Sequence, residues 1–171
     1  MLRSLASRFV SAVRSALGTE PRLKGRATPL PAHDGERLPG RYAGDFTGKA
    51  TVEYRPDPDG EADPGEIVWT WVPYEEDHSQ GKDRPVLIVG RHASALLALM
   101  LTSRDHDGRA RQADYIDIGT GDWDPQRRPS EVRIDRVLQI DPRAVRREGA
   151  VLARARFDLV ASGLRTRRGW Q

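Results

Sequence analysis

Apolar runs separated by polar loops occupy the chain from about residue 65 onward, whereas large apolar side chains are sparse before it. The clearest strand-like runs are Glu66 to Val72, Pro85 to Val89 and Leu96 to Leu101. Apolar residues lie on both faces of the first run, as a tightly curled small barrel requires. The third run is ambiguous by periodicity, but its length and the flanking turn formers favour a strand.

The second half of the chain predicts further strands and one closing helix. Strands are expected at Tyr115 to Ile118 and, once or twice, within Glu131 to Ile140. A turn at Arg104 to Arg109 and a long loop at Gly119 to Ser130 separate them. Asp141-Pro142 is typical of a helix start. The predicted helix, Ala150 to Leu164, carries an apolar stripe made of Val151, Ala155, Leu159 and Val160. The pattern therefore predicts a mainly β fold, a small barrel, with a C-terminal helix packed on it.

The first part of the chain reads as an extension, residues 1–41, in front of a barrel domain, residues 42–171. Apolar residues recur at helical spacing from Leu2 to Leu17 between arginines, which predicts a short basic amphipathic helix. Residues 19–41 have the composition of a linker. Residues 42–54 predict a short hairpin or strand, and Arg55 to Pro64 an exposed acidic loop.

Charge and composition narrow the possible partners and compartments. The net charge is only +3, but residues 126–171 carry twelve arginines against five acids, which suits an anionic partner such as nucleic acid. A merely solvated basic face explains the same arginines nearly as well. No cysteine is present, which favours a cytoplasmic protein, and no run of about 18 apolar residues would span a membrane.

Several common kinds of catalytic site find no support in the sequence. The four histidines lack metal-ligand spacing, so no metal site is expected. Gly119-Thr120-Gly121 lacks the lysine and helix of a phosphate-binding loop, and no serine stands in a nucleophile-elbow context.

One stretch resembles a known family. The sequence GEIVW at Gly65 to Trp69, a polar loop containing Gln80 and Gly81, and RPVLIV at Arg84 to Val89 resemble the opening of PemK/MazF toxins of toxin–antitoxin systems. The similarity extends over roughly residues 65–141. It implies an SH3-like barrel and a homodimer that cuts single-stranded RNA without metal or cofactor. It also implies a cognate antitoxin, and products with 2′,3′-cyclic phosphate and 5′-OH ends.

The resemblance also implies which residues carry the chemistry. Arg84, just before Pro85, would hold the scissile phosphate, and Thr102 would contact it through its hydroxyl. His78 matches a histidine of some members. Many other members of the family carry Glu one position later, where this chain has Ser79. Asp77 and Glu76 therefore remain alternatives to His78 as the general base. Arg133 and Asp135 match an R-x-D triplet that some members use as acid and base. Both side chains are expected to point outward from one strand face. There they can equally well form only an ion pair with each other.

RNA would bind in a groove between the loop of residues 74–83 and the ends of the second and third strands. The side chains expected to contact it are Tyr74, Gln80, Lys82, Ser103 and Arg104, with bases stacked on Tyr74 or Trp123. Two alternatives stay open: a non-catalytic binding module, favoured by the acids Glu75 to Asp77, and a toxin directed at DNA gyrase on the same fold.

Overall fold

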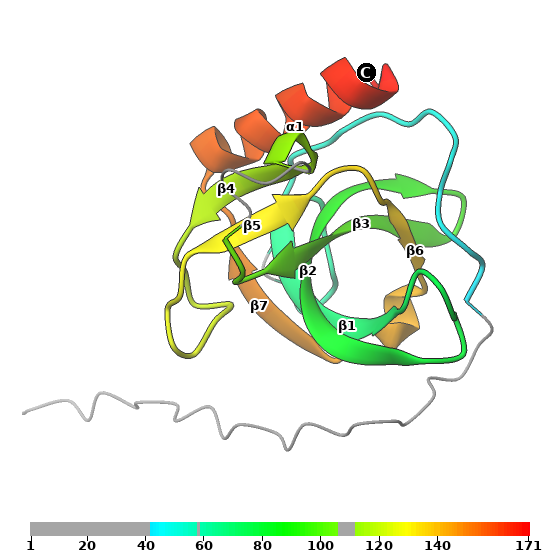
Figure 1. The fold of residues 1–171 in the computed structure, drawn as a ribbon, viewed down its shortest axis with the longest axis horizontal. Helices are drawn as coiled ribbons and strands as arrows, with labels where there is room; N and C mark the ends of the chain where they lie inside the picture. Colours follow the sequence, from blue (N-terminus) through cyan, green and yellow to red (C-terminus); the bar gives the residue numbers. More distant parts are fainter. Residues whose placement is uncertain (1–41, 58, 106–111) are drawn as a thin grey trace, which may run out of the picture. The chain divides into compact units, whose positions relative to one another are not determined.

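A computed structural model describes residues 42–57, 59–105 and 112–171 (Figure 1). The predicted N-terminal helix and linker, and most of the predicted turn at Arg104 to Arg109, lie outside the described residues. The strands are β1 (Glu66–Pro73), β2 (Gly81–His92), β3 (Ala95–Thr102), β4 (Tyr115–Gly119), β5 (Ser130–Arg133), β6 (Leu138–Ile140) and β7 (Arg147–Val151). The helices are α1 (Arg154–Arg168) and two single 3₁₀ turns, η1 (Gln112–Asp114) and η2 (Pro142–Ala144).

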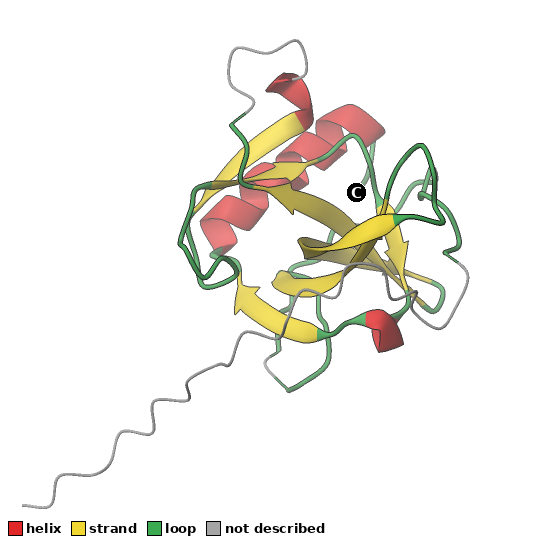
Figure 2. Ribbon diagram, turned by 60° about the horizontal axis from the view of Figure 1, so that its bottom comes forward, coloured by secondary structure: helices red, strands yellow, loops and turns green. Residues whose placement is uncertain are grey.

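The strands form one antiparallel sheet that curls on itself, with strand order β4-β5-β3-β2-β1-β7 (Figures 1 and 2). The far edge of β3 is shared, because Leu96–Ala98 pair with β6 and Leu101–Thr102 pair with β5. The sheet thus bends at β3, and α1 lies beside β4 on the outside of the curl. The predicted fold class, a small barrel-like sheet with a C-terminal helix, is confirmed.

Two apolar cores form because the central strands are apolar on both faces. Ile67, Leu87 and Leu99 face α1, where they pack with Phe157 and Val160 in what we call the helix-side core. The alternate residues of the same strands enclose the interior of the curl. This interior core contains Val68, Val86, Ile88, Leu96, Ala98 and Leu138. A period of two with apolar residues on both faces accounts for the unbroken apolar runs in the sequence.

Residues 42–57, which we call the strap, run along the outside of the sheet. They form only an isolated bridge, Asp45 with Leu138, so the predicted hairpin or strand is wrong. The strap is nevertheless well anchored. Val52 N donates to Gln171 O at 2.8 Å, Trp170 Nε1 donates to Gly48 O at 3.1 Å, and the rings of Phe46 and Trp170 meet edge to face. The strap and the C-terminal tail therefore hold each other in place.

The C-terminal helix begins later than its sequence pattern predicts. Residues 147–151 form β7 against β1, and α1 starts at Arg154. The predicted stripe is wrong in three of its four members, because Val151, Ala155 and Leu159 are exposed and only Val160 is buried. The buried face consists of Phe157, Val160, Ala161 and Leu164. Within the described part of the chain, no helix is long and apolar enough to cross a membrane.

The acidic stretch at Arg55 to Pro64 is only partly the exposed loop that the sequence predicts. Asp63 is buried and its carboxylate accepts a hydrogen bond from Arg91 Nη2 at 2.8 Å. Asp141 does cap a helical turn as predicted, since its side chain accepts from Arg143 N, but that turn is the short η2.

Candidate functional site

The loop between β1 and β2, residues 74–80, is closed by its own hydrogen bonds. Tyr74 N donates to Gln80 O at 2.8 Å. The carboxylate of Asp77 accepts from Ser79 N at 2.9 Å, from Ser79 Oγ at 2.6 Å and from Gln80 Nε2 at 2.7 Å. These bonds hold the pKa of Asp77 below its usual range, those from Ser79 contributing most. Asp77 therefore builds the loop and is a weak base.

Where the loop joins β2, Gly81 allows a close approach of the two strands. A Cβ atom at Gly81 would lie 2.4 Å from Val72 O and 2.6 Å from the ring of Trp71. Only glycine fits here, so the hairpin closes tightly and places Lys82 exposed near the start of the strand.

Arg84 lies in β2, half-buried, directly before Pro85 and opposite Thr70 of β1. Two acids that could pair with it, the adjacent Asp83 and Glu66 of β1, are engaged elsewhere. Asp83 pairs with Arg146 at 2.8 Å, and the carboxylate of Glu66 accepts from backbone N–H groups at 3.1 Å. Among the described residues, no ion pair or side-chain hydrogen bond engages the guanidinium of Arg84. Its charge is therefore available to an anionic ligand.

Thr102 leaves the sheet at the same end as Arg84. The β2–β3 ladder ends at the pair Val86 and Met100, and Arg84 and Thr102 each lie two residues beyond it. Thr102 Oγ1 accepts from Arg104 N at 3.1 Å, which turns the chain there and leaves the hydroxyl proton free to donate. The structure thus brings these two predicted site residues to one end of neighbouring strands, with Ser103 and Arg104 exposed beside them.

Arg133, at the end of β5, belongs to neither apolar core, unlike its neighbours Val132 and Ile134, but it is buried and not on an exposed strand face as predicted. Its Nε and Nη2 donate to the two oxygens of Asp135 at 2.6 and 2.8 Å, and its Nη1 lies 3.0 Å from Glu75 Oε2. The hydrogen bonds to Asp135 raise the pKa of Arg133 further above its usual range. The arginine therefore links β5 to the loop of residues 74–80, next to the end of β3.

His78 is exposed and packs against the strap. Its ring meets that of Tyr42 edge to face, with centroids 5.0 Å apart. Tyr42 OH donates to Asp45 Oδ1 at 2.5 Å, and Arg136 Nε donates to Asp45 Oδ2 at 2.9 Å. Burial raises the pKa of Asp45, but the hydrogen bonds from Arg136 and Tyr42 outweigh burial and lower it. Arg136 Nη1 also holds Pro73 O at 2.9 Å, where the loop begins.

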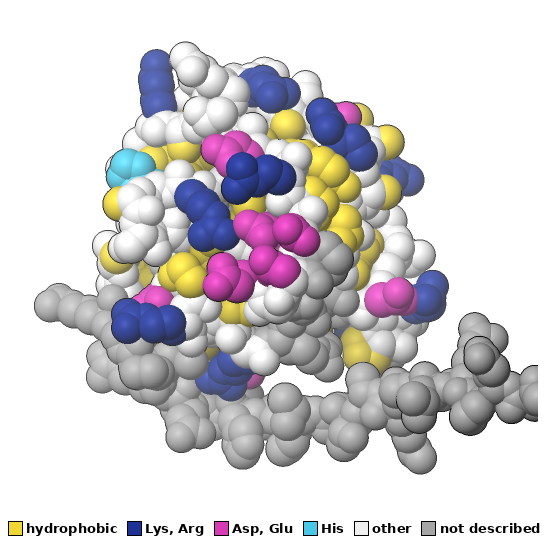
Figure 3. All heavy atoms as spheres, turned by 180° about the vertical axis from the view of Figure 1, so that it is seen from behind, with side chains coloured by type: hydrophobic (Ala, Val, Ile, Leu, Met, Phe, Trp, Pro, Cys, Tyr) yellow, Lys and Arg dark blue, Asp and Glu magenta, His cyan; other side chains and the backbone are white. Residues whose placement is uncertain are grey.

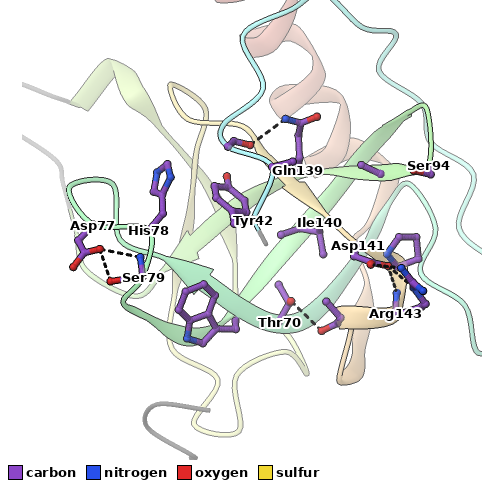
Figure 4. Close-up of a pocket in the computed structure, with 16 residues that line it drawn as sticks. Tyr42, Thr70, Asp77, His78, Ser79, Ser94, Gln139, Ile140, Asp141 and Arg143 are labelled. Carbon is purple, nitrogen blue, oxygen red and sulfur yellow. Dashed lines mark hydrogen bonds and ion pairs between the residues drawn. The ribbon is translucent and has the colours of Figure 1, made fainter. Parts of the chain in front are cut away.

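The predicted site residues thus fall into two neighbouring places. Arg84 and Thr102 lie at the strand ends, whereas His78 lines a pocket of about 1060 Å³ that neither of them lines (Figure 4). Trp123 belongs to neither place, so the prediction that bases stack on it is wrong. Its side chain is 4% exposed, and its Nε1 donates to Ser130 Oγ.

Acidic and basic side chains lie close together on the surface. On the face drawn in Figure 3, acidic side chains gather near the middle with basic ones beside them. Many arginines of the C-terminal part are paired locally, for example Arg128 with Asp124 and Arg154 with Asp158. Local pairing of this kind makes the excess of arginine in the sequence a weaker sign of nucleic-acid binding than Arg84, which forms no ion pair with any residue that the structure describes.

A family model described as PemK-like, MazF-like toxin of type II toxin-antitoxin system matches residues 63–166. The chain belongs to this toxin family. Among similar solved structures, the Mycobacterium tuberculosis toxin MazF-mt6 is 17% identical, with a TM-score of 0.45 over 62% of this chain and 98% of that chain. MazE-MazF from Deinococcus radiodurans is 18% identical, with a TM-score of 0.48 over 66% of this chain and 100% of that chain. No curated protein matches the sequence.

Two residues near the site of this PemK/MazF-family protein, Glu131 and Tyr42, could not be predicted from the sequence. Glu131 of β5 lies directly opposite Thr102 of β3, which places a carboxylate across from the proposed phosphate ligand. Nothing in the sequence signals this, because the register of β3 and β5 cannot be read from either strand alone. Tyr42 belongs to the strap, which precedes the region matched by the family model, so the family pattern does not point to it.

Proposed function

We propose that this toxin-family protein is a metal-independent, sequence-selective endoribonuclease that cuts single-stranded RNA. The reaction needs a base for the ribose 2′-OH, a cation for the charge that develops on the phosphate, and an acid for the leaving 5′-oxygen. All three are side-chain roles. The products are a 2′,3′-cyclic phosphate and a 5′-OH end.

The observation that carries the proposal is the guanidinium of Arg84, half-buried and engaged by no ion pair or side-chain hydrogen bond from the described residues. Structural arginines that are partly buried are usually paired, because an unpaired buried charge is costly. A planar, permanently charged group at a strand end fits a phosphodiester. Thr102, at the same end, supplies a hydroxyl donor.

The other roles follow from the contacts. His78 is the proposed base, since it is exposed and a neutral imidazole nitrogen can accept a proton. Glu76 is the alternative, because Asp77 is held in hydrogen bonds that weaken it as a base. Arg133 does not release a proton at neutral pH, so we assign it, with Asp135, to positioning the loop through Glu75.

The remaining predicted residues complete the RNA-binding surface. Contacts to RNA are proposed for Tyr74, Gln80, Lys82, Ser103 and Arg104, of which Gln80, Lys82, Ser103 and Arg104 are exposed. We further propose that the protein acts in the cytoplasm as a homodimer that shares the RNA groove, held in check by a cognate antitoxin.

Cleavage of a mixed RNA by the purified protein in the presence of EDTA tests the proposal. Wild type should cut and leave 5′-OH ends, and Arg84→Ala should lose roughly 10²- to 10³-fold in rate, the usual effect of removing one group that stabilises developing charge. Arg165→Ala is the control, because Arg165 is exposed on α1 outside the site. Absence of EDTA-resistant cutting by wild type would favour the non-catalytic module. Inhibition of gyrase with RNA left intact would favour the gyrase-directed toxin.

A further inference from the structure

The pocket that His78 lines has a volume of about 1060 Å³ (Figure 4). The start of the strap, residues 42–44, and the loop around His78 line one part of it, where the rings of Tyr42 and His78 meet. Thr70 and Trp71 of β1, Ile140 of β6 and η2 also line it. The strap precedes the region matched by the family model, so the family pattern does not account for this pocket.

The lining is rich in aromatic rings. Tyr42, Trp71 and His78 all contribute to it, and all three are at least partly exposed. Tyr42 and His78 meet with an interplanar angle of 86°. In such an edge-to-face pair, each ring keeps at least one face that the other ring does not cover. The hydrogen bond from Tyr42 OH to Asp45 fixes its ring in this position. These rings offer a preset stacking surface for a flat ligand.

The charges of the pocket suit a neutral polar ligand better than a phosphate. Asp141 accepts from Arg143 Nε at 3.1 Å and from Nη2 at 2.8 Å, so this acid and this base neutralise each other. Both oxygens of Asp77 accept hydrogen bonds within its own loop. Gln139 Nε2 donates to Gly44 O, which leaves the amide oxygen of Gln139 able to accept from a ligand. Stacking faces combined with uncharged hydrogen-bonding groups match a nucleobase.

The pocket lies one strand away from Arg84. Thr70, which lines the pocket, is the direct partner of Arg84 across the β1–β2 ladder. Directly paired residues of an antiparallel ladder have Cα atoms about 4.5–5.5 Å apart. A phosphate held by Arg84 would therefore stand close enough to the pocket for a neighbouring base of the same strand to enter it.

We propose that this pocket binds one nucleobase of the RNA, flipped out beside the scissile phosphate, and that Tyr42 of the strap is its stacking platform. The inference rests on the proposed nuclease function for its biological meaning, but binding in the pocket can be measured without cleavage. The strap thereby sets part of the sequence selectivity.

Binding of the four uncharged nucleosides, adenosine, cytidine, guanosine and uridine, followed by ligand-detected NMR, tests the pocket directly. Wild type and Arg84→Ala should bind the same preferred nucleoside, because a nucleoside carries no phosphate. Tyr42→Ala should bind it roughly 5- to 150-fold more weakly, the range expected for one lost stacking contact. Ser94→Phe should also lose binding, since Ser94 is an exposed residue of the pocket rim and a phenyl ring there fills the space without altering the strap. Arg165→Ala should bind as wild type does.

Mapping the ends of RNA cut by the same proteins separates this inference from the nuclease proposal. If wild type cuts, Ser94→Phe should cut with a relaxed preference at one position beside the cleaved bond. Unchanged preference in both Ser94→Phe and Tyr42→Ala would overturn the base pocket while leaving the nuclease intact. Nucleoside binding without any RNA cutting would overturn the nuclease while supporting the pocket. Failure of wild type to bind any of the four nucleosides would overturn the inference.

Discussion

Replacing Arg133 by alanine should destabilise the protein strongly, although the residue belongs to neither apolar core. The guanidinium forms two parallel hydrogen bonds to Asp135, and the two side chains are only 9% and 13% exposed. Removing the arginine leaves the carboxylate of Asp135 buried without this partner. Breaking a buried pair in this way costs about 3–5 kcal/mol. The third contact, to the half-exposed Glu75, adds less than about 1 kcal/mol.

The chain contains a matched control for this experiment. Arg143 and Asp141 are also two residues apart and also form two parallel hydrogen bonds, through Nε and Nη2 at 3.1 and 2.8 Å. This pair is exposed, with 89% of the Arg143 side chain open to solvent. Arg143→Ala should therefore leave the unfolding midpoint unchanged within error. The two variants share their local geometry and differ in burial.

Equilibrium unfolding in urea, followed by tryptophan fluorescence, measures both variants. A loss of several kcal/mol in Arg133→Ala and none in Arg143→Ala would confirm that burial sets the effect. If the two variants lost the same amount, or if Arg133→Ala lost less than about 1 kcal/mol, the buried-pair argument would be refuted and a directly catalytic role for Arg133 would gain ground.

Three further substitutions probe the strap and its contacts and a fourth, Gly163→Ala, serves as a control, each by the same unfolding measurement. The lowered pKa of Asp45 contributes stability above its unfolded pKa, about 4, that is lost as the pH falls through the folded value. The deficit of Asp45→Asn relative to wild type should therefore shrink from pH 7 to pH 3, and a constant deficit would contradict this. A Cβ atom at Gly90 would lie 2.7 Å from the backbone oxygen of Thr51, so Gly90→Ala should cost about 1–3 kcal/mol. At Gly163 the nearest atoms are flexible side-chain ends and helix propensity favours alanine, so Gly163→Ala should stay within about 1 kcal/mol; equal losses at the two glycines would be unexpected. Trp170→Ala should cost about 3–5 kcal/mol, because the ring is 4% exposed and bonded to the strap, and a loss below about 1 kcal/mol would show that the tail does not hold it.

The sequence was most informative where both faces of a strand are apolar. The runs that became β1, β2 and β3 could be predicted because each is short, apolar and bounded by turn formers, which favours a buried strand over a helix. The boundary between β7 and α1 could not, because Ala150 and Val151 continue the helical spacing of the residues after them. Pairing of β7 with β1 overrides that local pattern.

Individual residues of the candidate site could be predicted from the sequence, but their burial and their contacts with one another could not. Arg84 and Thr102 stand out by their places in the family pattern, and the register of β2 and β3 does bring them to one end of the sheet. The burial of Arg133 and of Trp123 depends on what packs above them from distant parts of the chain. The same holds for the partnership of His78 with Tyr42, which lies 36 positions earlier and outside the matched region.

The interlocking of the strap with the C-terminal tail means that the smallest unit able to fold is larger than the unit by which the family is recognised. A chain trimmed to residues 63–166 would lack Phe46, Val52 and Trp170, all three of which are buried against the helix-side core. It would expose apolar surface that the whole chain covers, and its insolubility would say nothing about the toxin itself.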